Sequence, residues 1–183
     1  MSDLTSAQSP IWMGALVAVA ALTSFALACG MPFAAIGALA ALTLGWRDAV
    51  ILAGLAWFTN QVIGFGFLDY PLDTLTLAWG LALGLSAIAA VEGAMLSIRL
   101  LGATSLARLP ISFLGAWASQ QATVFVASLI LGASDTAFAP SVLWFIFWTN
   151  AVAFLVLAMA QMIGARVGLA RPIASAVRPP ATA

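Results

Sequence analysis

Six mostly apolar stretches, separated by short polar segments, make up most of the chain. A helix needs about 20 apolar residues to cross the hydrocarbon core of a bilayer, and most of these stretches are near that length. The pattern therefore predicts an all-α integral membrane protein, a compact bundle with spans over Ile11 to about Cys29, Phe33–Trp46, Ala49–Leu68, Leu75–Ile98, Ile111–Leu131 and Ser141–Ile163.

The second stretch is the shortest, even if it begins at Met31. At 1.5 Å per residue, a helix of about 17 residues is roughly 25 Å long and reaches only across a thin or pinched bilayer. Five full spans plus a re-entrant segment are therefore the alternative to six transmembrane helices. We prefer six, because Phe33 to Leu44 is apolar throughout and re-entrant backbone must be buried in protein.

Charged residues follow the expected loops in a sorted order. In the six-span arrangement all the basic residues fall on one side, and three acids (Asp69, Asp73 and Asp135) fall on the other. Because cytoplasmic loops carry the excess of arginine, both termini are predicted to be cytoplasmic. The N-terminal segment carries only Asp3, so charge does not decide between five and six spans. The basic residues are Arg47, Arg99, Arg108, Arg166, Arg171 and Arg178.

Composition narrows the class of protein further. Hydrophobic residues make up 64% of the 183 positions, more than a soluble domain of this size can bury. We expect a cytoplasmic segment over residues 1–10, one transmembrane domain over 11–165 and a disordered cytoplasmic tail over 166–183. The chain has no histidine and one cysteine, and no hydrolase, redox or nucleotide motif, so we expect neither an enzyme nor a resident cofactor. The net charge is zero, so the chain has no excess of positive charge that would favour binding to nucleic acid.

Polar residues gather where the third and fourth stretches meet the acidic side. Amides both donate and accept hydrogen bonds, which suits a neutral polar ligand. Hydrogen bonds between helices, together with an aromatic belt at the membrane surface, are the alternative explanation. The candidate ligand-binding residues of this group are Asn60, Gln61, Asp69, Tyr70 and Trp79, with Asp73 beside them.

A second polar group is expected near the middle of the bundle. Gln120 and Gln121 are adjacent on the fifth stretch, so their side chains point about 100° apart and at least one is predicted to face the interior. On the sixth stretch, Asn150 follows Trp148, which shares a helix face with Trp144. Amides beside an aromatic wall would suit a flat conjugated ligand, whereas lipid-facing or core tryptophans are the alternative.

Two further features carry possible chemistry. Cys29 and Met31 lie at the first turn on the acidic side, where a thiol and a thioether would suit a soft metal or a metal-bearing cofactor. An inert buried cysteine at a helix end is the alternative. Glu92 is the one acid well inside a span, and we expect it to pair with an arginine of the basic rim or to contribute to a subunit contact.

Small residues recur at four-residue spacing along the first stretch, which lets helices approach closely. Packing within the chain and docking onto another membrane subunit are both compatible with this pattern. The candidate docking residues are Gly14, Ala18, Ala20, Ser24 and Ala28.

With this architecture, the chain resembles the substrate-binding (S) components of energy-coupling-factor vitamin transporters. The resemblance covers Ile11 to about Ile163 and lies in the length, the compact bundle, the small-residue first helix and the polar outer loops. It implies a bacterial inner-membrane protein that binds a vitamin-like solute from outside and docks onto a coupling subunit driven by ATPases. The solitary cobalamin-uptake branch is one possibility, in which Cys29 would contact the cobalt of a corrinoid.

Two functions therefore follow from the sequence. The first is an uptake component for a small vitamin-like solute, held in a cavity near the acidic side. The second is a non-catalytic accessory or assembly subunit of a larger membrane complex, in which the polar residues pair with each other inside a solid bundle.

Overall fold

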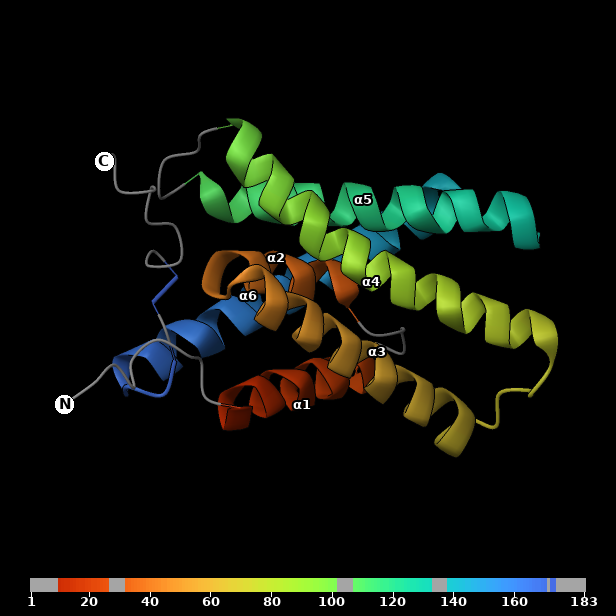
Figure 1. The fold of residues 1–183 in the computed structure, drawn as a ribbon, viewed down its shortest axis with the longest axis horizontal. Helices are drawn as coiled ribbons and strands as arrows, with labels where there is room; N and C mark the ends of the chain where they lie inside the picture. Colours follow the sequence, from red (N-terminus) through yellow and green to blue (C-terminus); the bar gives the residue numbers. More distant parts are fainter. Residues whose placement is uncertain (1–9, 27–31, 102–106, 133–137, 171, 174–183) are drawn as a thin grey trace.

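The computed structural model describes residues 10–26, 32–101, 107–132, 138–170 and 172–173. Within these ranges the chain is all-helical and contains six helices and no strand (Figure 1). Most of the predicted terminal segments, residues 1–10 and 166–183, lies outside the described residues. The helices are α1 (Pro10–Ala26), α2 (Phe33–Thr43), α3 (Trp46–Phe67), α4 (Thr74–Leu101), α5 (Arg108–Leu131) and α6 (Pro140–Arg166).

Four of the helices, α3 to α6, are long and apolar enough to cross a membrane. They contain 22, 28, 24 and 27 residues, and each is close to its predicted stretch, with ends extended by up to three residues. The prediction of an all-helical chain with membrane-spanning helices is confirmed to that extent. The number of spans and the side on which the termini lie remain predictions.

The second stretch differs from its prediction. The helix α2 has 11 residues and ends at Thr43, whereas a helix reaching Trp46 was expected. Leu44 and Gly45 are extended, with φ/ψ of −119°/156° and −70°/161°, and Trp46 already begins α3. The carbonyl of Gly45 accepts the N–H of Ala49, so this glycine closes one helix and opens the next. At 1.5 Å per residue α2 is about 16 Å long, roughly half the thickness of a hydrocarbon core.

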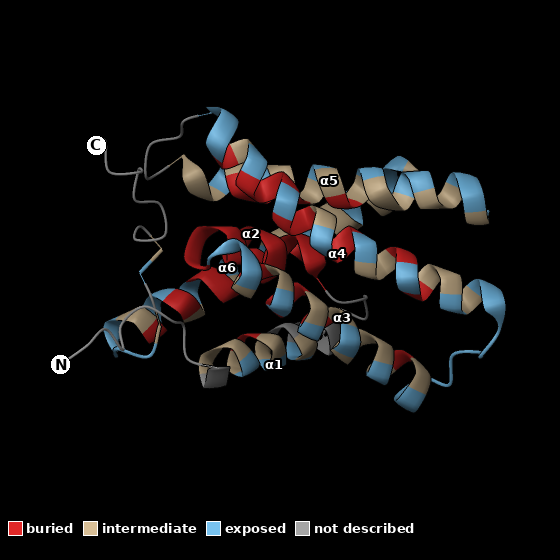
Figure 2. Ribbon diagram, in the orientation of Figure 1, coloured by how far each residue is buried: buried red, intermediate tan, exposed pale blue. Residues whose placement is uncertain are grey.

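The short helix α2 is the centre of the bundle. All of its residues are buried, and it packs against α3, α4, α5 and α6. Figure 2 shows it as the one helix that is buried along its whole length, with the others around it. Helix α1 lies on the outside, against α3 and α6. The core of this membrane protein is therefore an alanine-rich helix surrounded by longer ones.

Glycines set the closest helix crossings. A Cβ atom on Gly37 of α2 would lie 2.9 Å from the backbone carbon of Ala90 on α4. A Cβ on Gly93 of α4 would lie 2.5 Å from the carbonyl oxygen of Gly115 on α5, and a Cβ on Gly115 would lie 2.6 Å from the carbonyl oxygen of Gly93. Because real side-chain carbons do not approach backbone this closely, only glycine permits these contacts.

The described arginines all lie at one end of the bundle. Arg47 lies in the first turn of α3, Arg99 lies in the last turn of α4, Arg108 begins α5 and Arg166 ends α6. The connection 68–73 between α3 and α4, which contains two acids, lies at the opposite end (Figure 1). The four described arginines and two of the three predicted acids thus lie at opposite ends of the bundle, whereas Asp135, Arg171 and Arg178 lie outside the described residues.

Candidate functional site

One residue of the predicted polar group at the acidic end, Gln61, forms a hydrogen bond between α3 and α4. Gln61 donates from Nε2 to the carbonyl oxygen of Gly80 at 3.2 Å, and Trp57 donates from Nε1 to the same oxygen at 2.7 Å. Asn60 and Trp79 are half-buried on the same two helices. This part of the predicted site therefore ties two helices together.

Asp69 and Tyr70 form the turn that ends α3. Asp69 has a positive φ of 52°, a conformation that Asp adopts more readily than most residues. The N–H of Tyr70 donates to the carbonyl of Gly64 at 3.1 Å, and the Tyr70 ring lies over the same glycine, 2.8 Å from where its Cβ would be. A ring seated on a glycine fixes the turn, so both residues have a structural role here.

Asp73 caps the N-terminus of α4. Its carboxylate accepts the backbone N–H of Thr76 at 2.9 Å and the hydroxyl of Thr76 at 3.0 Å. Both bonds favour the charged form, the backbone bond most, and they lower the pKa of Asp73 below its ordinary value of 3.8. A negative charge at a helix N-terminus is also favoured by the helix dipole.

The two adjacent glutamines of α5 separate as predicted. Gln120 is buried, with 7% of its surface exposed, and Gln121 is half-buried. Gln120 belongs to the buried face of α5 together with Phe113 and Ala116. Its Oε1 atom has no hydrogen-bond partner among the described residues, and neither has the Nε1 atom of Trp117, one turn earlier.

Asn150 of α6 joins the interior at the N-terminus of α2. Its Oδ1 accepts the N–H of Ala35 in the first turn of α2 at 3.4 Å, and its Nδ2 donates to the carbonyl of Ile146 at 3.0 Å. The first N–H groups of a helix have no partner within the helix, so a side chain from a neighbouring helix supplies one here. This is the interior point at which α2 and α6 present polar groups to each other.

The predicted aromatic wall of α6 is at the surface of the bundle. Trp144 and Trp148 contact edge to face at a centroid distance of 5.5 Å, and about half or more of each side chain is exposed. Phe147 of α6 packs against α5, and its ring centroid lies 5.4 Å from that of Trp117 and 5.5 Å from that of Phe113. Trp148 therefore belongs to the outer surface, and the interior wall is formed by Phe147 and its neighbours on α5.

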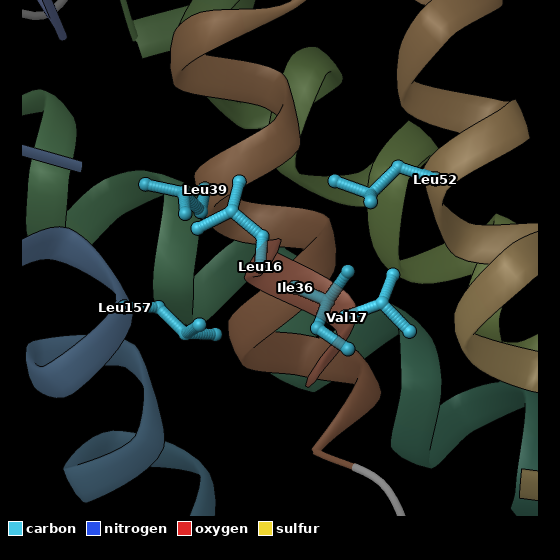
Figure 3. Close-up of a pocket in the computed structure, with 6 residues that line it drawn as sticks. All are labelled: Leu16, Val17, Ile36, Leu39, Leu52 and Leu157. Atoms are coloured by element: carbon cyan, nitrogen blue, oxygen red, sulfur yellow. The ribbon is translucent and has the colours of Figure 1, made fainter. Parts of the chain in front are cut away.

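Two spaces in the structure are apolar, and none of the predicted ligand-binding residues lines either. The first lies among α1, α2, α3 and α6 and has no room for a water molecule (Figure 3). It is lined by Leu16, Val17, Ile36, Leu39, Leu52 and Leu157. The second is an open groove of about 530 Å³ between α4 and α5. Its walls include Ala78, Leu81, Leu85, Val126 and Ile130.

Part of the predicted chemistry lies outside the described residues. Cys29, Met31 and Asp135 are among these, as is Ala28 of the predicted docking face. Ala20 and Ser24 are in α1, but their side chains are not described. Gly14 and Ala18 are exposed, and a Cβ on Gly14 would meet no atom within 4 Å.

Tryptophan hydrogen bonds are the feature that sequence reasoning missed. Trp12 of α1 donates to Oε1 of Gln161 on α6 at 2.7 Å, where Gln161 is fully buried. Trp46 of α3 donates to the carboxylate of Glu92 on α4, so the partner of this exposed acid within the chain is an indole, where an arginine was expected. A subunit contact of Glu92 remains a prediction. The sequence does show that these polar residues lie well inside apolar stretches, and a polar side chain at such a position needs a hydrogen-bond partner.

Potential metal ligands are sparse in the part of the chain that the structure describes. In that part of the chain, no three or more Asp, Glu, Cys or His side chains form a group that could hold a metal ion. No protein-family model, curated protein or solved structure matches the chain.

Proposed function

We propose that this chain is a membrane uptake component that binds a small, neutral, vitamin-like organic solute inside its helical bundle. The single observation that carries the proposal is α2, a helix of 11 residues that is buried throughout and begins inside the bundle. Its first turn donates to Asn150 from a neighbouring helix. Discontinuous helices whose ends lie within the bundle are typical of solute sites in membrane transporters.

The chemistry at this point favours a neutral solute with acceptor groups. The N-terminus of α2 has a partial positive charge from its unpaired N–H groups. Asn150 and Gln120 are amides, and no charged side chain is buried among the described residues. A carbonyl or hydroxyl of a solute would accept from such N–H groups without bringing a net charge into the membrane.

The resemblance to S components supplies the first compound to test. Cobalamin absorbs visible light, and a thiolate from Cys29 would suit its cobalt ion. Purified full-length protein would be incubated with cyanocobalamin, which is neutral, and in parallel with aquocobalamin, which carries one positive charge. It would then be separated from free vitamin by gel filtration and measured for absorbance. We expect retention by the unaltered chain, loss with Cys29→Ser, and weaker retention with Asn150→Leu. Thr123→Leu, at a half-buried position that is not a predicted site residue, is the control.

A negative result has a defined meaning. If the unaltered protein retains neither form of cobalamin nor any compound from a panel of water-soluble vitamins, the uptake proposal is wrong. If it retains a different vitamin and Cys29→Ser has no effect, the uptake proposal stands and the corrinoid is excluded. We propose the bacterial inner membrane as its location.

The exposed small residues of α1 supply the proposed contact with a coupling subunit and its ATPases. Gly14 and Ala18 lie on the outer surface, while Leu16 and Val17 pack inward. Substitution of Gly14 by Leu is expected to reduce copurification with a coupling subunit, without changing solute retention. If Gly14→Leu copurifies with the coupling subunit as well as the unaltered protein does, this face of α1 is not the docking surface.

A non-catalytic accessory subunit is the second candidate function, and one observation favours it. The carbonyl of Gly80 accepts from both Trp57 and Gln61, so Gln61, which was predicted to hold a ligand, joins α3 to α4 instead. This function predicts that the chain retains no solute and that a larger complex loses stability when the chain is absent.

A further inference from the structure

Two buried polar atoms on α5 have no partner among the described residues. They are Nε1 of Trp117, which is a donor only, and Oε1 of Gln120, which is an acceptor. The two residues are three apart on one helix, so their side chains lie on neighbouring positions of the same face. Buried polar groups are nearly always hydrogen-bonded, and leaving two neighbouring groups unpaired is costly.

Two other half-buried indoles that pack against the core show how unusual this is. Trp12 donates to Gln161, and Trp57 donates to the carbonyl of Gly80. Each of these bonds joins two helices. Trp117 packs against the hydrophobic core in the same way, yet its N–H group has no such partner among the described residues.

The surroundings restrict what can satisfy both atoms. Phe147 lies edge to face with the Trp117 ring at 5.4 Å, and Gln120 is 7% exposed. A charged ligand group would be expensive in this apolar setting. A carboxylate has no proton to donate to Gln120, and an ammonium group has no lone pair to accept from Trp117. A hydroxyl group does both.

We propose that Trp117 and Gln120 form a two-point site for one hydroxyl group, which accepts from the indole N–H and donates to the amide oxygen. The group belongs either to a bound water molecule or to an alcohol of the transported solute. The second source rests on the proposed uptake function. In that case the site adds a requirement for the solute: a hydroxyl that reaches the middle of the bundle.

A double-mutant cycle on the full-length protein in detergent tests the site. The variants are Trp117→Phe, Gln120→Met and the pair, with Gln121→Met and Trp144→Phe as matched controls at half-buried and exposed positions. Melting temperatures are measured on rapidly purified protein and again after dialysis that removes small molecules. If one group bridges both atoms, each single substitution lowers the melting temperature by about 2–4 °C, and the pair lowers it no further.

The result also identifies the source of the hydroxyl. Coupling that persists after dialysis indicates water, and coupling that is present only before dialysis indicates a retained solute. The site would be overturned if the single substitutions leave the melting temperature unchanged or raise it, and if their effects are additive in both samples. That result would mean that each polar atom is unpaired in the unaltered protein. Cobalamin retention is measured separately, so failure of the uptake proposal does not imply failure of this site.

If a variant does not fold, the unaltered protein still provides a test. With ¹⁵N-labelled tryptophan, the Trp117 indole signal is assigned in the unaltered protein by magnetisation transfer to the ring of Phe147, whose centroid lies 5.4 Å away. A magnetisation transfer between that proton and a water or solute hydroxyl proton supports the site, and its absence under conditions where Trp144 shows one to water contradicts it.

Discussion

The crossing of α4 and α5 gives the sharpest test of the fold, through Gly93→Ala. The new Cβ would lie 2.5 Å from the carbonyl oxygen of Gly115 and 1.9 Å from Oγ of Ser119. The hydroxyl of Ser119 can rotate away, but the Cβ of Ser119, also 2.5 Å from the new Cβ, and the Gly115 carbonyl are fixed to the α5 backbone and cannot. A carbon and a carbonyl oxygen need about 3.3 Å, so the two helices must separate by roughly 0.8 Å.

The separation has a calculable cost. A gap of 0.5–1 Å removes about a quarter to a half of the dispersion attraction along the crossing, and overpacking of this kind costs roughly 1–3 kcal/mol. The gain in helix propensity from glycine to alanine offsets about 1 kcal/mol of that. We therefore expect a net loss of up to about 2 kcal/mol in the free energy of unfolding.

Gly54→Ala is the matched control, because no atom lies within 4 Å of a Cβ at this position inside α3. Unfolding of the purified protein by sodium dodecyl sulfate, followed by tryptophan fluorescence, should show a lower midpoint for Gly93→Ala and a higher one for Gly54→Ala. The pair Gly93→Ala/Ser119→Ala should remain less stable than Ser119→Ala alone, since the carbonyl obstacle is unchanged. A Gly93→Ala midpoint equal to that of Gly54→Ala would refute the reasoning.

Three other predictions concern hydrogen bonds. The pKa of Asp73 is lowered from 3.8, so the stabilisation of α4 by this cap is fully present above pH 3.8 and is lost as the pH falls below that value. The difference in melting temperature between the unaltered protein and Asp73→Ala should therefore shrink as the pH is lowered through this range. A difference that stays constant would contradict the capping role. Trp57→Phe removes the 2.7 Å bond to the Gly80 carbonyl and should lower the unfolding free energy by about 0.5–1.5 kcal/mol in the same detergent titration. Trp46→Phe leaves Glu92 without its indole donor, and adding Glu92→Gln should restore part of the lost stability; two additive losses in that cycle would show that the bond is not formed.

Periodicity and length predict most of the helices of this chain, because apolar stretches of about 20 residues have one stable form in a bilayer. The end of α2 was missed for a local reason. Leu44 is as apolar as its neighbours, and only its extended backbone, followed by Gly45, shows that the helix stops before Trp46. Apolar composition does not encode such a break.

The candidate site was harder to predict than the helices. The 100° between adjacent side chains was enough to place one of Gln120 and Gln121 inside. By contrast, Gln61 shares an acceptor with Trp57 on a carbonyl 19 residues away, and that pairing depends on how α3 and α4 cross. Backbone acceptors have no sequence signature, so a polar residue inside a span could be identified as needing a partner but not matched to one.

The complete burial of α2 has a consequence for how the protein is made. Helices that span a bilayer can enter it independently and associate afterwards. This route is closed to α2, because it is too short to cross and none of its 11 residues faces lipid in the folded state. Its native surroundings consist of α3, α4, α5 and α6, three of which follow it by a full loop or more along the chain. During synthesis α2 can therefore reach its buried position only after the helices that enclose it have emerged from the ribosome, and its backbone ends are unpaired until then.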